Sequence, residues 1–142
     1  MQQGHIKAAR LVGSIYYWGH GVAVDYRRAM AAYKVGAEGG DAACQYQVGM
    51  MYCKGRGVDV DYKQAWAWFK KAAAQDYPNA VNALGAMYGN GKGVTPSFRR
   101  AREYYKRAIE LGDSQVVKNM QILTEGIQNV TRVASSAPPC DI

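Results

Sequence analysis

A ten-residue segment that returns twice at a fixed interval constrains the fold of this chain more than any other feature. Residues 49–58 read GMMYCKGRGV, residues 13–22 read GSIYYWGHGV, and residues 85–94 read GAMYGNGKGV. The interval is 36 residues in both cases. Self-similarity at a period of about 20 to 50 residues is typical of solenoids, in which each repeat buries its apolar face by stacking on its neighbours. We therefore predict a repeat protein.

Each repeat is expected to fold as a helix hairpin. When the repeats are superposed, Val12, Val48 and Leu84 coincide, and apolar residues recur about one helical turn before and after each of them. This spacing is that of one apolar stripe on an amphipathic helix. The stripe that we expect to be buried consists of Ala8, Val12, Ile15 and Tyr16 in repeat one, Cys44, Val48, Met51 and Tyr52 in repeat two, and Ala80, Leu84, Met87 and Tyr88 in repeat three.

A glycine inside the first helix recurs in every repeat, at Gly13, Gly49 and Gly85. Glycine costs about 1 kcal/mol relative to alanine inside a helix, so a packing requirement should offset that cost. We expect close approach by the second helix of the same repeat, whose own small residues recur in step, beginning with Ala29.

The first helix of each repeat ends in the sequence GxGV. Two glycines here allow a left-handed helix cap followed by a tight reversal of the chain. A phosphate-binding loop is not favoured, because the segment follows a helix and lacks the GxxxxGK[ST] spacing. Asp25, Asp61 and Ser97 then occupy one register, where their side-chain oxygens suit the N-cap of the second helix.

The domain organisation follows from this register. We predict one domain over residues 1–134, closed by a capping helix that lacks the GxGV turn, and then a polar, proline-containing tail that is disordered. The predicted ranges are 5–40, 41–76 and 77–112 for the repeats, 113–134 for the capping helix and 135–142 for the tail.

The pattern AxxxLGxxYxxGxGVxxDxxxAxxxYxxAA, in three copies from Ile6 to Gly112, resembles the Sel-1-like repeat family, a relative of the tetratricopeptide repeat. The resemblance implies an all-α fold, an α/α solenoid that winds as a right-handed superhelix of antiparallel helix pairs. It also implies that the first helices line a concave groove, and that the chain is a non-enzymatic adaptor that assembles proteins.

Candidate groove residues are those that remain on the first helices once the apolar stripe is removed, because these residues differ from repeat to repeat. Amide side chains could bond the backbone of an extended peptide, aromatic and methionine side chains offer apolar area, and basic side chains could hold an acidic residue or a C-terminal carboxylate. The candidates are Lys7, Arg10, Ser14, Tyr17, Tyr46, Met50, Asn79, Asn82 and Lys118.

The net charge of +7 raises an alternative function. Residues 97–111 carry five basic and two acidic side chains. A run of charge on an outer helix is usually a solvated face, but it could also bind nucleic acid or anionic lipid. The residues of this alternative basic surface are Arg99, Arg100, Arg102, Lys106 and Arg107.

The sequence gives no positive sign of an enzyme. His5 and His20 are the only histidines, and no paired carboxylates suit general acid and base catalysis. We expect no cofactor, no metal and no membrane span, since no run approaches about 18 apolar residues. The expected partner is a protein or peptide, with nucleic acid left open. We expect a monomer, with end-to-end association of copies left open.

Three cysteines, Cys44, Cys53 and Cys140, form no CxxC motif, so we expect free thiols. Cys44 lies on the apolar stripe, whereas Cys53 is expected on the exposed side of the same helix and should react first. Free thiols and the absence of an apolar signal-peptide segment favour the cytoplasm.

Overall fold

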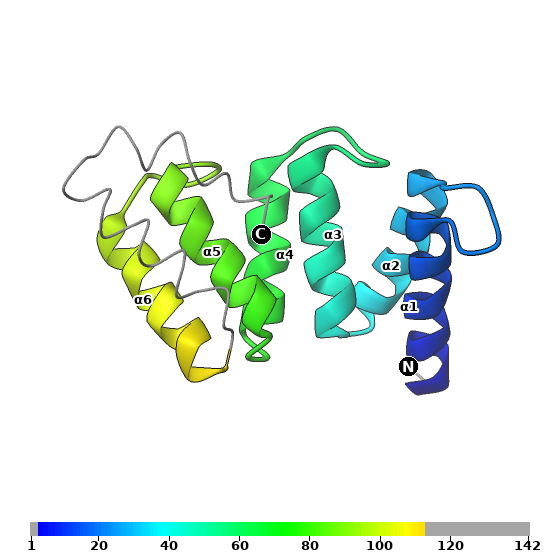
Figure 1. Ribbon diagram of the computed structural model, residues 1–142, viewed down its shortest axis with the longest axis horizontal. Coiled ribbons are helices and arrows are strands. Elements are labelled where there is room, and N and C mark those ends of the chain that lie inside the picture. The colour runs from blue at the N-terminus through cyan, green and yellow to red at the C-terminus, as the bar shows by residue number, and fades with distance from the viewer. Residues whose placement is uncertain (1–2, 113–142) are drawn as a thin grey trace. The chain divides into compact units, whose positions relative to one another are not determined.

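The computed structural model describes residues 3–112, and within that range the chain is helical with no strand (Figure 1). This confirms the predicted all-α fold and the two helices of each repeat. The helices are α1 (Gln3–Trp18), α2 (Tyr26–Glu38), α3 (Ala42–Lys54), α4 (Tyr62–Ala73), α5 (Pro78–Asn90) and α6 (Phe98–Glu110). The predicted capping helix 113–134 and tail 135–142 lie outside the described residues.

The described residues fall into two compact units, one up to Ala72 and one from Ala73 on. The N-terminal unit holds α1, α2, α3 and all but the last residue of α4, and α2 packs against both α1 and α3. In the C-terminal unit α5 packs against α6. Figure 1 shows these hairpins as paired ribbons, blue and cyan for α1 and α2, and green and yellow for α5 and α6.

The GxGV segments are turns, as predicted. All six of their glycines have a positive φ, between 68° and 80°. Gly55 and Gly91 are left-handed C-caps of α3 and α5, where each donates its backbone N–H to the carbonyl oxygen of a methionine four residues earlier. The three predicted N-caps are also present: Asp25, Asp61 and Ser97 each accept a hydrogen bond from the backbone N–H three residues later.

The second helix of each repeat approaches the recurring glycine of the first helix closely, as predicted. The group that makes the contact is an aromatic ring. A Cβ added at Gly49 would lie 2.6 Å from Cε1 of Phe69, and Gly13 and Gly85 have the same relation to Tyr33 and Tyr105. No real Cβ contact is that short, so a side chain at these positions would displace a ring. The expectation that small residues such as Ala29 make this contact is wrong.

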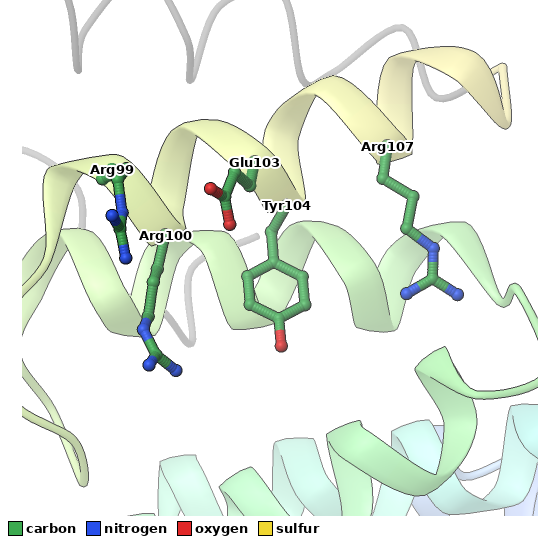
Figure 2. A pocket seen from close by; sticks show the side chains of 5 residues that line it. All are labelled: Arg99, Arg100, Glu103, Tyr104 and Arg107. Carbon is green, nitrogen blue, oxygen red and sulfur yellow. The ribbon is translucent and has the colours of Figure 1, made fainter.

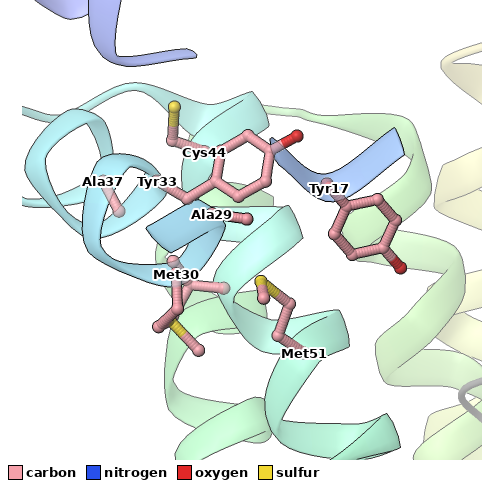
Figure 3. Close-up of a cluster of buried hydrophobic side chains, with 8 residues drawn as sticks. Tyr17, Ala29, Met30, Tyr33, Ala37, Cys44 and Met51 are labelled. Atoms are coloured by element: carbon pink, nitrogen blue, oxygen red, sulfur yellow. The ribbon is translucent and has the colours of Figure 1, made fainter. Parts of the chain in front are cut away.

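A cluster of buried apolar side chains in the N-terminal unit draws on α1, α2 and α3 (Figure 3). It joins the buried face of α2 to residues of both neighbouring helices. Its members are Tyr17, Ala29, Met30, Tyr33, Ala37, Cys44, Val48 and Met51.

The buried face of α1 differs from the prediction. Ile6, Ala9 and Tyr17 are buried, whereas Val12 of the predicted stripe is 41% exposed and Ala8 is exposed as well. In α3 the equivalent residues are fully buried, because α2 covers them. Among the described residues no helix covers this side of α1, so the superposition of repeats is misleading at the first helix.

Candidate partner-binding site

An open hollow of about 350 Å³ lies on α1. It is lined by Lys7, Arg10, Leu11 and Ser14, which follow one another at the i, i+3, i+4, i+7 spacing of a single helix face. We call this the α1 hollow. It brings together three of the predicted groove residues, Lys7, Arg10 and Ser14, with one apolar residue that sequence reasoning did not single out.

Hydrogen bonds to the neighbouring helices hold two side chains of the α1 hollow. Arg10 Nη2 donates to Asp41 Oδ1 at 2.7 Å. Ser14 Oγ lies 3.1 Å from the hydroxyl oxygen of Tyr33 on α2. Burial raises the pKa of Tyr33, so this hydroxyl stays protonated and is a poor base. Hydrogen bonds therefore fix the polar edges of the α1 hollow.

Asp41 supports the α1 hollow and also caps α3. Its Oδ2 accepts the backbone N–H of Cys44 at 2.9 Å, while its Oδ1 accepts Arg10. Burial raises the pKa of Asp41, but the hydrogen bonds from Cys44 and Arg10 favour the carboxylate more strongly, so the net pKa is lowered.

Replacing Asp41 with Asn should remove the charge while keeping a cap. Because the folded pKa lies below the unfolded value of about 3.9, the charge stabilises the fold above that value and loses its effect as pH falls through the folded pKa. We expect Asp41→Asn to be less stable than the parent by about 0.5 to 2 kcal/mol at pH 7, by urea unfolding. The difference should shrink at pH 2 to 3. An equal difference at both pH values would contradict the assignment.

Four predicted groove residues are not on an accessible surface. Tyr17 is buried because its ring contacts Tyr26 and Tyr33, and Arg56 donates to its hydroxyl at 2.7 Å. The turn after α3 carries Arg56, so the next repeat closes over this tyrosine.

The other three residues, on α3 and α5, are also buried. Tyr46 contacts the ring of Phe69, with ring centroids 5.7 Å apart, and Met50 and Asn82 are 5% and 0% exposed. The expectation that these side chains face a groove is wrong, because these helices are buried on more than one face. Asn79 is exposed, and Lys118 lies outside the described residues.

A second open hollow, of about 260 Å³, lies on α6, and we call it the α6 hollow. Figure 2 shows side chains of one face of α6 around it. Three belong to the predicted basic surface, while Arg102 and Lys106 are exposed but do not line it. Its lining is Arg99, Arg100, Glu103, Tyr104 and Arg107.

Two arginines of the α6 hollow already contact groups of the protein itself. The guanidinium of Arg100 lies 5.7 Å from the ring centroid of Tyr88, which is stacked on Tyr104 at 5.6 Å. Arg107 Nη2 donates at 2.6 Å both to the carbonyl oxygen of Ala73 and to Asp76. Arg107 is therefore engaged within the C-terminal unit.

The cysteines differ from the prediction. Cys53 is buried and disulfide-bonded, so the expectation of an exposed, fast-reacting thiol is wrong at this position. Cys44 is a free thiol and fully buried, as predicted. Burial and the nearby carboxylate of Asp41 raise the pKa of Cys44 to about 12.

Cys44 should resist iodoacetamide at pH 8 in the native chain. Its pKa of about 12 keeps the thiol protonated, and the reactive species is the thiolate. Modification of the peptide that contains Cys44, followed by mass spectrometry, should therefore rise only over the urea range in which the chain unfolds. Native-state labelling as fast as in the unfolded chain would contradict the burial of this thiol.

Among residues 3–112, no group of three or more histidine, cysteine, aspartate or glutamate side chains could hold a metal ion. None of the described helices is both long enough and apolar enough to cross a membrane.

Comparison with known proteins identifies the repeats. The Sel1 repeat family matches at residues 6–41, 42–77 and 78–113, one residue later than the predicted boundaries. A search of the curated proteins found no match.

Similar solved structures include three with TM-scores between 0.68 and 0.80. The crystal structure of c5321, a protective antigen present in uropathogenic Escherichia coli strains and displaying an SLR fold, is 36% identical with a TM-score of 0.80, and the match covers 83% of this chain and 25% of that one. A Sel1 repeat protein from Oxalobacter formigenes is 32% identical with a TM-score of 0.75 (80% and 47% covered). Helicobacter pylori cysteine rich protein B is similar in fold, at 19% identity and a TM-score of 0.68 (82% and 89% covered).

The chain spans a quarter and about half of the length of the first two structures. The family match covers most of the chain, and Sel1 repeats are generally protein–protein interaction modules and typically non-enzymatic scaffolds. The chain belongs to the Sel1 repeat family.

Proposed function

We propose that this chain is a non-enzymatic adaptor that binds a segment of a partner protein at the α1 hollow. The observation that carries the proposal is the joint exposure of Lys7, Arg10 and Leu11 around one open hollow. Two basic groups beside an apolar one suit a segment that presents an acidic residue or a C-terminal carboxylate next to an apolar side chain.

The proposal is narrower than a groove that runs along all first helices. Tyr46, Met50 and Asn82 are buried, so they could contact a partner only after a rearrangement. Asn79 is exposed on α5 and remains a candidate contact in the C-terminal unit. The chemistry of the α1 hollow supports binding and not catalysis, because Ser14 bonds a tyrosine hydroxyl and no histidine.

A photo-crosslinking amino acid at Lys7, in the intact chain, tests this proposal. We expect it to trap one or a few proteins from a lysate of the source organism, and excess unmodified chain should compete with the trapping. The matched control is the same amino acid at Lys63, an exposed lysine on α4 of the same unit. If the two positions trap the same proteins equally, or if trapping at Lys7 is not competed, the α1 hollow is not the binding site.

A second candidate function rests on the α6 hollow, where Arg99 and Arg100 are exposed beside Tyr104. These groups could bind nucleic acid or anionic lipid through phosphates and stacking. The two candidates differ in salt dependence. Binding of duplex DNA or phosphatidylserine vesicles through α6 should fall steeply between 50 and 200 mM salt and should be abolished by Arg99→Glu with Arg100→Glu. The same double variant should leave partner trapping at Lys7 unchanged.

A further inference from the structure

A strip of apolar side chains runs beside the α1 hollow along the same helix. Leu11 is 63% exposed, Trp18 61% and Val12 41%, and exposed Ala8 and half-buried Ile15 lie on the same face of the helix. We call these five residues the α1 strip. Single exposed apolar residues are ordinary, but several that line one helix face mark a contact surface.

The repeat register indicates what covers such a face. Thirty-six residues after Ala8, Val12 and Ile15 come Cys44, Val48 and Met51, all three fully buried on α3. Helix α2 covers them so closely that a Cβ on Gly36 would lie 2.5 Å from Cys44 Sγ. In repeat two, a helix therefore packs on the equivalent positions, and a small residue of that helix allows the close contact.

Two positions of the α1 strip carry a large apolar side chain in repeat one alone. The counterparts of Leu11 and Trp18 are Gln47 and Lys54 in repeat two, where Lys54 is exposed, and Ala83 and Asn90 in repeat three, where Ala83 is buried. Stacking of one repeat on another therefore does not require large apolar side chains at these two positions. Their exposure to water is unfavourable unless another apolar surface covers them.

Charge favours a partner over a second copy. Lys7 and Arg10 lie along one edge of the α1 strip, beside Leu11, α1 contains no acidic residue, and the chain as a whole carries a net charge of +7. Asp41 pairs with Arg10, but Lys7 is exposed. Two copies would repel one another, whereas a partner with acidic side chains would be attracted.

We propose that the α1 strip binds an acidic amphipathic helix of a partner protein, which packs on α1 as α2 packs on α3. Its apolar stripe would cover Leu11, Val12 and Trp18, a glycine or alanine would seat it at Ala8, and glutamate or aspartate at its edge would face Lys7. This inference rests on the proposed function and specifies the partner of the same surface.

The test uses the intact chain and three synthetic peptides of about five helical turns. The first has a leucine and alanine stripe flanked by glutamates, the second has lysines in place of the glutamates, and the third equals the first with two central prolines. We expect calorimetry to give the first peptide an affinity about tenfold or more above the other two.

Leu11→Gln with Trp18→Lys introduces the residues of repeat two at matching positions, so this variant should fold. It should weaken binding of the first peptide by about tenfold or more, whereas Ile109→Gln, at another exposed apolar residue, should change it less than about twofold. Circular dichroism at matched concentrations checks folding.

Several outcomes would overturn the inference. Equal affinity for the proline peptide would exclude a helix, and equal affinity for the lysine peptide would exclude an acidic one. Sedimentation that gives a dimer, which the double variant abolishes, would assign the α1 strip to a second copy. If a longer natural form of the protein does not bind the peptide, a segment of that longer chain itself covers the α1 strip. Trapping at Lys7 that persists in the double variant would retain the proposed function and remove this inference alone.

Discussion

Phe69→Ala should lower the free energy of unfolding by about 3 to 5 kcal/mol. Phe69 is fully buried, its ring lies against Gly49, and the tilted ring of Tyr46 also contacts it. Removing the ring leaves a cavity that Gly49 cannot fill, because it has no side chain. Urea unfolding followed by circular dichroism measures the loss.

A double-mutant cycle makes the same prediction specific to the ring contact. Gly49→Ala alone should destabilise the fold by about 1 to 3 kcal/mol, because its Cβ would collide with the Phe69 ring at 2.6 Å. In the Phe69→Ala background the added methyl enters the cavity, so Gly49→Ala should be neutral or stabilising. Additive effects of the two changes would mean that the ring and the glycine do not meet.

The sequence predicted a close helix contact at Gly49 but not the residue that makes it. Periodicity identifies which face of a helix is buried and where close approach is required, and Gly49 met both criteria. It does not say which side chain of the partner helix crosses the gap. The ring of Phe69 reaches Gly49 because an aromatic side chain extends several ångströms from its own backbone, whereas an alanine contributes only a methyl group.

The α1 hollow could be predicted only in part. Lys7, Arg10 and Ser14 were found by removing one apolar stripe from the helix, and the same elimination wrongly retained Met50 and Asn82. A first helix between two second helices has two buried faces, as α3 has against α2 and α4. A single apolar stripe therefore predicts too few buried residues in an interior repeat. In α1 it predicts too many.

Leu11 was missed for a related reason. The superposition of repeats selects positions that stay apolar, and this position changes from leucine to glutamine in repeat two. The signal that could have found it is a large apolar residue at a position that is polar in the next repeat. Such a change marks a surface particular to one repeat, and it cannot mark the core that all repeats share.

Gly57→Ala is expected to destabilise the fold by about 2 to 5 kcal/mol, the combined cost of two separate effects. Gly57 has a φ of +76°, where an alanine is strained by about 1 to 2 kcal/mol. Its missing Cβ would also lie 2.5 Å from the carbonyl oxygen of Tyr26, at the start of α2. Backbone cannot swing aside as a side chain can, so the turn after α3 would be forced away from α2.

Gly21 provides the matched control, because it is the residue 36 positions earlier and has a φ of +80° with nothing within 4 Å of an added Cβ. Gly21→Ala should therefore show the conformational strain alone, about 1 to 2 kcal/mol. The excess in Gly57→Ala then measures how tightly the turn of one repeat rests on the second helix of the repeat before it. Equal losses in urea unfolding would show that this contact is loose, and that the GxGV glycines serve only the local reversal of the chain.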